Sequence, residues 1–421
     1  MTRLAIAALL ALSACDRPRF DAPEDAAPSP NASILPAPLA QSPAELAPAG
    51  SARADNVSSQ IASPLEALRG DREVSADPLG PKETLGVTLT GEWRFPDLPG
   101  PPKAPEVHLE GIAAARRAMA LRWQIALTES GRMRITFDGR AFPVPAGTEL
   151  RARADRLGHV LVFPTGADYR AVPPGALRAL FGDRRLDVVP LVGGQVTPKG
   201  MAPSRAGRAV RRVEIASKMG TLTLDLARVP EAGLGAALLC RALVELVAVD
   251  PATPLCAAEE LPLRAQLTWP AGGGIVFEAQ DPSKRTEIPL ADVLVPPPSA
   301  QLVHAMPAQR ASVLVSRDEA AAFRTRAIDL PPPSPGAPSE GLLARNMTDS
   351  LRYLVLDGVP LAWLMPGGEQ LVLGLARGRY TASWRSFLGD ANEPPRTVEA
   401  PGRITLGEAP DAGAPAPAKS K

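Results

Sequence analysis

Short runs of alternating apolar and polar residues, each closed by a glycine- or proline-containing turn, recur along most of this chain. Residues 86–95 (GVTLTGEWRF) alternate with period two, which places their apolar side chains on one face of a strand. Residues 121–127 and 132–137 repeat the pattern, with the turn-forming sequence Glu-Ser-Gly between them. Closely spaced strand signals separated by turns predict sheets rather than a helical bundle.

Turn chemistry suggests how some of these strands are connected. Asp138-Gly139 precedes the strand-like residues 141–144, and an Asp-Gly pair suits the type I′ turn of a tight hairpin. The Gly-, Pro- and Lys-rich stretch 193–207 is interpreted instead as a connection between two folded units.

Few segments have the pattern of a helix. Residues 235–248 (GAALLCRALVELVA) are apolar almost all round, and Arg241 and Glu245 lie four residues apart on the single polar stripe. This helix is therefore expected to be nearly buried. Shorter helices are predicted over 174–181 and over 316–326, where a serine and a glutamate have capping-box spacing.

The first fifteen residues (MTRLAIAALLALSAC) carry one basic residue, an apolar run and then Leu12-Ser13-Ala14-Cys15. They resemble the signal of bacterial lipoproteins, in which small residues precede a lipidated cysteine. The resemblance implies a lipid on Cys15, which anchors the protein to a membrane when two or more acyl chains are attached. It also implies a location in the bacterial envelope, facing the periplasm or the cell exterior. The resemblance does not distinguish the inner from the outer membrane.

Composition separates tether-like segments from foldable ones. Residues 16–82 and 408–421 are rich in Pro, Ala and Ser with few large apolar side chains, so they cannot offset their conformational entropy by burial. We predict a mainly β protein of the α+β class, with β-sandwich-like units on a disordered tether. The predicted parts are a signal peptide (1–15), a tether (16–82), a β-rich domain (83–192), an α+β domain (208–329), a small β module (340–407) and a tail (408–421).

The expected envelope location determines how the other two cysteines are interpreted. With Cys15 lipidated, Cys240 and Cys256 form an even pair in an oxidising compartment, and we predict a disulfide between them. Two buried free thiols are the alternative.

The C-terminal part of the chain has the order strand, Asp-Gly, strand, Pro-Gly turn, strand, Gly-x-Tyr, strand. It resembles small β-sandwich modules of bacterial surface proteins, the PEGA-like and carboxypeptidase-regulatory-like type. The Pro-Glu-Gly-Ala signature itself is absent, and Pro366-Gly367-Gly368-Glu369 stands nearby instead. Such modules are usually not catalytic, and the Pro-rich segment 330–339 is interpreted as the linker that precedes this one.

The search for chemistry finds no catalytic, cofactor or metal motif. The net charge of +1 gives no electrostatic case for nucleic acid. The three histidines are isolated in sequence, and His159 is interpreted as a surface residue at a strand end. A hydrolase would require a pocket that joins residues such as Asp155, His159 and Asp168.

The sequence therefore favours a non-enzymatic binding or structural role for a lipid-anchored envelope protein. Its expected partners are the membrane, through the anchor, and an envelope protein or the cell wall; no small-molecule cofactor and no metal is expected. An envelope hydrolase with an unrecognised active site is the alternative function.

Overall fold

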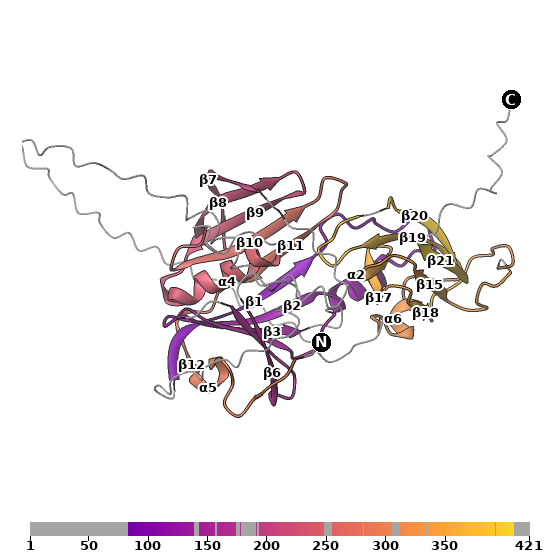
Figure 1. The fold of residues 1–421 in the computed structure, drawn as a ribbon. Helices are drawn as coiled ribbons and strands as arrows, with labels where there is room; N and C mark the ends of the chain where they lie inside the picture. The colour runs from indigo at the N-terminus through magenta and orange to yellow at the C-terminus, as the bar shows by residue number, and fades with distance from the viewer. Residues whose placement is uncertain are drawn as a thin grey trace, which may run out of the picture. The chain divides into compact units, whose positions relative to one another are not determined.

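The computed structural model of the 421-residue chain describes residues 83–138, 143–155, 158–173, 177, 191, 193–247, 255–280, 282–304, 312–333, 335–391 and 393–407. Strands dominate and helices are few and short, so the predicted fold class is confirmed (Figure 1). The predictions made for the signal, the tether and the tail lie outside the described residues. So does the predicted helix over 174–181, apart from Leu177.

Within the described residues, 13 strands form one sheet (Figure 1). Its order is β13-β6-β5-β4-β3-β2-β1-β11-β10-β9-β8-β7, and β12 pairs with the start of β1. All neighbours are antiparallel except β13, which is parallel to β6. The strands are β1 (Glu83–Arg94), β2 (Leu121–Thr128), β3 (Arg132–Asp138), β4 (Glu149–Arg153), β5 (His159–Val162), β6 (Asp168–Val172), β7 (Gln195–Arg205), β8 (Arg208–Ser217), β9 (Gly220–Arg228), β10 (Glu260–Thr268), β11 (Gly274–Gln280), β12 (Thr286–Pro289) and β13 (Gln301–Leu302).

Strand β1 joins the two halves of this sheet. Trp93 on β1 is in register with Leu121 on one side and with Phe277 on the other. The ranges 83–192 and 208–329 therefore contribute strands to the same hydrogen-bonded sheet. Their division into separately folding domains stays a prediction.

One face of the large sheet is covered by α4 (Gly233–Leu246), which contacts β10, β2, β3 and β4. The period-two alternation of the strands turns their apolar residues toward this helix, and the two form one core. A Cβ on Gly235 would lie 2.8 Å from the carbonyl oxygen of Thr128, so the helix comes this close to β2 only with glycine there. The expectation of a nearly buried helix is confirmed.

Two local predictions were wrong. The stretch taken as a connection contains the outermost strand β7, most of which is exposed. Pro198 fits there because an edge strand has no second neighbour that would need the missing N–H. Strand β3 pairs with β4 instead of forming the predicted tight hairpin; Pro143 and Val144 lie in a bend, and residues 139–142 lie outside the described part of the chain.

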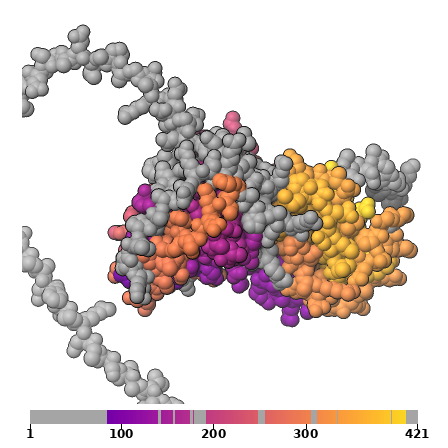
Figure 2. Space-filling model, turned by 60° about the horizontal axis from the view of Figure 1, so that its bottom comes forward, coloured from indigo at the N-terminus to yellow at the C-terminus, as the bar shows by residue number. Residues whose placement is uncertain are grey.

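The C-terminal region, orange to yellow on the right of Figure 2, contains two further sheets. Their orders, within the described residues, are β14-β17-β16-β19-β20 and β18-β15-β21, and β15 and β21 run parallel. The predicted strands around the Asp357-Gly358 turn are confirmed, and both residues have the positive φ of a type I′ turn, 49° and 77°. The strands are β14 (Ser312–Val313), β15 (Leu342–Asn346), β16 (Arg352–Leu356), β17 (Val359–Leu364), β18 (Glu369–Val372), β19 (Gly378–Arg385), β20 (Arg396–Ala400) and β21 (Gly402–Leu406).

Residues 312–324, which precede the Pro-rich segment, contact the C-terminal sheets. Strand β14 pairs with β17, and helix α6 (Arg317–Ala321) follows it with the predicted capping box on Ser316. Just beyond α6, the Arg324 guanidinium contacts the Asp357 carboxylate at 2.8 Å, and neither side chain is exposed. The Pro-rich segment is therefore flanked on both sides by residues of the same pair of sheets.

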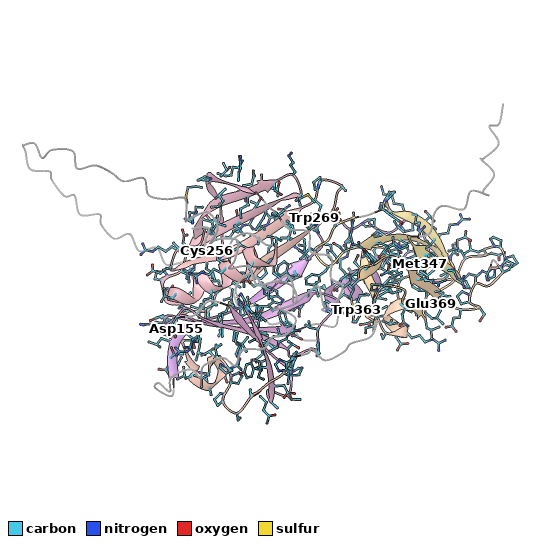
Figure 3. The ribbon with its side chains drawn as sticks, viewed as in Figure 1. Asp155, Cys256, Trp269, Met347, Trp363 and Glu369 are labelled. Carbon is cyan, nitrogen blue, oxygen red and sulfur yellow. A yellow bond between two sulfur atoms is a disulfide. The ribbon has the colours of Figure 1, made fainter. Side chains whose placement is uncertain are left out.

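Contacts join the C-terminal sheets to the rest of the described chain in several places, among them Tyr353 against Phe95 and Arg385 against Asp97. Helix α2 (Leu109–Ala118) donates from Arg116 Nε to the Gly358 carbonyl at 3.0 Å. The loop after β19 inserts Phe387 and Leu388 among the core side chains of the large sheet and α4. Trp269, at the side of the large sheet nearest these strands, donates from its indole to the Leu388 carbonyl at 2.8 Å (Figure 3).

Candidate functional site

The residues required by the hydrolase hypothesis do not form a common site. The Asp155 carboxylate accepts a hydrogen bond from Arg153 at 2.7 Å. The His159 imidazole instead contacts Glu245 of α4 at 2.8 Å. Asp168 begins β6, where it is in register with Gln301.

The interpretation of His159 as a surface residue was wrong. The His159 and Glu245 side chains are each only 5% exposed, and their contact links β5 to α4 inside the core. The backbone N–H of Leu177 also donates to Glu245, at 3.3 Å. A glutamate in a nearly buried helix indicates a buried polar partner, but nothing in the sequence indicated that the partner would be His159.

The structure contains a disulfide between Cys240 and Cys256. Cys240 is buried on α4, and Cys256 lies shortly before β10, which packs against the same helix. Their Cα atoms are 5.8 Å apart, within the usual range for a disulfide.

We expect both cysteines to resist alkylation when the protein is denatured without reductant. Intact-mass measurement of the alkylated protein checks this, and the same sample alkylated after reduction is the control. Two added alkyl groups without reductant would contradict the bond.

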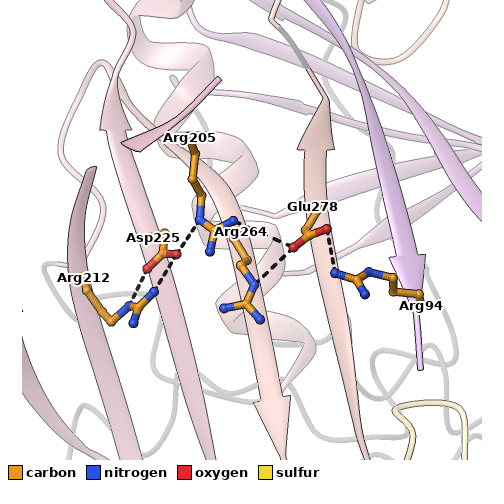
Figure 4. A network of polar contacts seen from close by, with 6 residues as sticks. All are labelled: Arg94, Arg205, Arg212, Asp225, Arg264 and Glu278. Carbon is orange, nitrogen blue, oxygen red and sulfur yellow. Dashed lines mark hydrogen bonds and ion pairs between the residues drawn. The ribbon is translucent and has the colours of Figure 1, made fainter. Parts of the chain in front are cut away.

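The face of the large sheet opposite α4 carries a network of guanidinium and carboxylate groups (Figure 4). Asp225 on β9 accepts from Arg212 Nε at 2.6 Å and from Arg205 Nε at 2.7 Å. Glu278 on β11 contacts Arg94 at 2.8 Å and Arg264 at 3.3 Å. The network thus spans six strands, from β7 to β1, and its ion pairs connect side chains of different strands.

Asp225 makes the folded state sensitive to acid. Burial acts to raise the pKa of this carboxyl, but the hydrogen bonds from Arg212 and Arg205 outweigh it, so the pKa lies below its ordinary value. A carboxyl with a lower pKa in the folded state stabilises the fold above its unfolded pKa of about 3.9. That stabilisation is lost as the pH falls through the folded pKa.

We therefore expect the unfolding free energy of the Asp225→Asn variant to fall less between pH 7 and pH 3 than that of the wild type. Urea unfolding at several pH values measures this, with Asp329→Asn at an exposed position as the control. Parallel curves for Asp225→Asn and the wild type would contradict the expectation.

A groove of about 610 Å³ lies on the C-terminal sheets, in the size range of ligand sites. One wall is the Pro-rich segment and the other is β20 with β21. Its lining residues are Leu330, Pro331, Pro332, Pro333, Pro335, Gly336, Ala337, Arg377, Arg396, Thr397, Val398, Glu399, Pro401, Gly402, Arg403, Ile404 and Thr405.

Three arginines hold the walls of the groove through backbone carbonyl groups. Arg377 donates to the carbonyls of Leu330 and Pro331, and Arg403 donates to that of Gly336 at 3.2 Å. Arg396 at the start of β20 donates to the Thr405 carbonyl near the end of β21. The Pro-rich segment is thereby fixed beside the strands.

The groove has an excess of positive charge. Its acidic residue, Glu399, accepts from Arg379 at 3.1 Å. Among the described residues, no carboxylate forms an ion pair with Arg377, Arg396 or Arg403, whose partners are neutral carbonyls. A guanidinium that is bonded to neutral carbonyls keeps an uncompensated positive charge and further N–H donors. It can therefore bind a carboxylate or phosphate group of a ligand.

Sequence reasoning missed this groove. Its arginines come from three separate parts of the C-terminal region and form no motif. The segment that makes its second wall had been interpreted as a linker. Only the pairing of β15 with β21 brings the two ends of the region together.

Two other features are absent from the part of the chain that the structure describes. There, no group of three His, Cys, Asp or Glu residues could hold a metal ion. Likewise, none of the helices found there has the length and apolar character needed to cross a membrane.

Comparison with known proteins adds little. No protein-family model and no curated protein matches the chain. Among solved structures, a putative outer membrane lipoprotein-sorting protein domain from Vibrio parahaemolyticus is similar over 48% of this chain and 86% of its own, at 9% identity. The TM-score of 0.20 is too low for that likeness to support any conclusion about fold or function.

Proposed function

We propose that this chain is a lipid-anchored protein of the bacterial envelope with a non-enzymatic binding role, and that the arginine-lined groove is its binding site. The observation that carries the proposal is a concave surface with three guanidinium groups that have no described carboxylate partner. Cys15 is the proposed lipidation site. The tether over 16–82 would hold the folded part away from the membrane.

The chemistry of the groove supports binding rather than catalysis. General acid–base and nucleophilic catalysis need a positioned base beside the reacting group. The described lining residues include one acid, Glu399, which is already paired with Arg379. Groove arginines can bind and orient an anionic group, but a guanidinium carries only hydrogen-bond donors and no acceptor, so it cannot serve as the base.

The proposal is tested by crosslinking in living cells followed by affinity purification. The wild type is compared with Cys15→Ser, with Arg396→Gln/Arg403→Gln, and with the control Arg228→Gln/Arg285→Gln. The control removes two exposed arginines that pair with Glu259 and Glu129, and such surface pairs contribute little to stability.

We expect a specific partner from the wild type and from the control, but not from the groove variant. Cys15→Ser should leave the membrane fraction. Capture that is unchanged in the groove variant would contradict the groove as the binding site. A wild type that is absent from membranes would contradict the anchor.

A further inference from the structure

We propose, on the basis that the groove is the binding site, that its ligand is an extended peptide segment with acidic side chains that lies along the outer edge of β20. The proposal joins two features of the groove. One is its charge, and the other is the backbone of β20.

The groove runs along the edge of β20 rather than over one face of it. Successive side chains of a strand point to opposite faces of its sheet. Four consecutive residues, Arg396 to Glu399, nevertheless line the groove. A cavity lined by side chains from both faces of the sheet must run along the edge of the strand.

The outer edge of β20 has backbone groups to offer. Strand β20 is outermost in its sheet and pairs with β19 on one side only. In the described part of the chain, no backbone hydrogen bond connects β20 with the Pro-rich wall. An unpaired strand edge is the template on which an extended peptide can add as a further strand.

The Pro-rich wall keeps this edge open. Pro331, Pro332, Pro333 and Pro335 have no N–H to donate, so the segment cannot itself complete a ladder with β20. Arg377 and Arg403 hold it at the far side of the groove through its carbonyl groups. The space between is therefore bounded by an open strand edge on one side and, on the other, by a wall whose four prolines have no N–H to donate.

Charge selects among the peptides that could pair there. Arg396 and Arg403 lie toward opposite ends of the two strands that form the wall, so their guanidinium groups can contact acidic side chains at separate positions of an extended ligand. Arginine binds carboxylates through paired donors, which favours acidic side chains over neutral ones. The backbone edge favours a peptide over a phosphate polymer, which has no amide groups to pair.

The test uses the full chain with Cys15→Ser and fluorescence anisotropy with labelled synthetic peptides. The first peptide alternates Glu and Thr, and its matched control alternates Gln and Thr. A third carries the Glu-Thr sequence with backbone N-methylation at alternate residues. Inorganic polyphosphate represents the other class of anionic ligand.

The Glu-Thr peptide should bind, and the affinity should decrease as salt screens the charges. Replacing Glu by Gln, or using Arg396→Gln/Arg403→Gln, should weaken binding by about tenfold or more, because charge-assisted hydrogen bonds are lost. N-methylation should weaken it as well, and Arg228→Gln/Arg285→Gln should leave it unchanged.

Several results would overturn the inference. Equal binding of the Glu and Gln peptides would remove the charge argument, and equal binding of the N-methylated peptide would remove strand pairing. Binding of polyphosphate but of no peptide would assign the groove to phosphate polymers. If no peptide binds while capture in cells still depends on Arg396 and Arg403, the peptide inference fails and the proposed function stands. If capture in cells does not depend on these two arginines, the peptide inference and the groove as binding site both fail.

Discussion

Replacing Asp357 with alanine is expected to lower the free energy of unfolding by about 3–5 kcal/mol, because removing one partner of a buried ion pair leaves the other charge uncompensated. The carboxylate contacts Arg324 at 2.8 Å and accepts from the backbone N–H of Thr381 at the same distance. The Arg324 guanidinium also lies 4.0 Å from the centre of the Tyr380 ring. The change would thus disturb the segment after α6, the turn between β16 and β17, and β19 together.

Urea unfolding followed by circular dichroism measures this effect. Glu369→Ala is the matched control, because Glu369 pairs with Arg345 across two strands of the same region but is about half exposed. Exposed pairs contribute about 0–1 kcal/mol. The double variant Arg324→Met/Asp357→Leu should recover part of the loss, since it removes both charges. A loss below about 1 kcal/mol for Asp357→Ala would contradict the assignment of a buried pair.

Replacing Phe387 with alanine should cost a similar amount, about 3–5 kcal/mol, which is typical of deleting a buried phenylalanine. The ring lies in an apolar pocket with Trp93, Trp123 and Phe137, although Phe387 itself follows β19, a strand of a C-terminal sheet. The variant should also loosen the C-terminal sheets from the large sheet, because the loop from Phe387 to Asp390 is a principal contact between them.

Two measurements separate these effects. Chemical unfolding reports the loss of stability, and Leu373→Ala, at a partly exposed position of the C-terminal region, is the control with an expected small change. Hydrogen exchange should show faster exchange of the Trp269 indole N–H, which donates to the Leu388 carbonyl. Unchanged indole exchange together with full stability would exclude Phe387 as an anchor.

Local patterns predicted the local structure well. The alternation at 121–127 and 132–137 and the Asp357-Gly358 turn correspond to strands and a turn at nearly the predicted residues. Such features depend on side chains within a few positions of one another, so a single sequence contains the necessary information. The capping box at Ser316 is predictable for the same reason.

Features that depend on distant residues were missed. His159 meets Glu245 across 86 positions, and the strand pattern around His159 is compatible with either a buried or an exposed imidazole. The prolines of β7 suggested a connection, because the sequence does not reveal that this strand is outermost. The groove required the positions of β20, β21 and the Pro-rich segment together, which no local pattern encodes.

The two ends of the 13-stranded sheet have a consequence for how copies of this protein meet. Within the residues that the structure describes, one end is β13, with two residues, and the other is β7, with prolines at 198 and 203 and two shifts of register. Very short strands, prolines and bulges at an edge all prevent another chain from extending a sheet. These edges disfavour the merging of large sheets from two copies, so a high local concentration on a surface is expected to leave the large sheets of neighbouring copies separate.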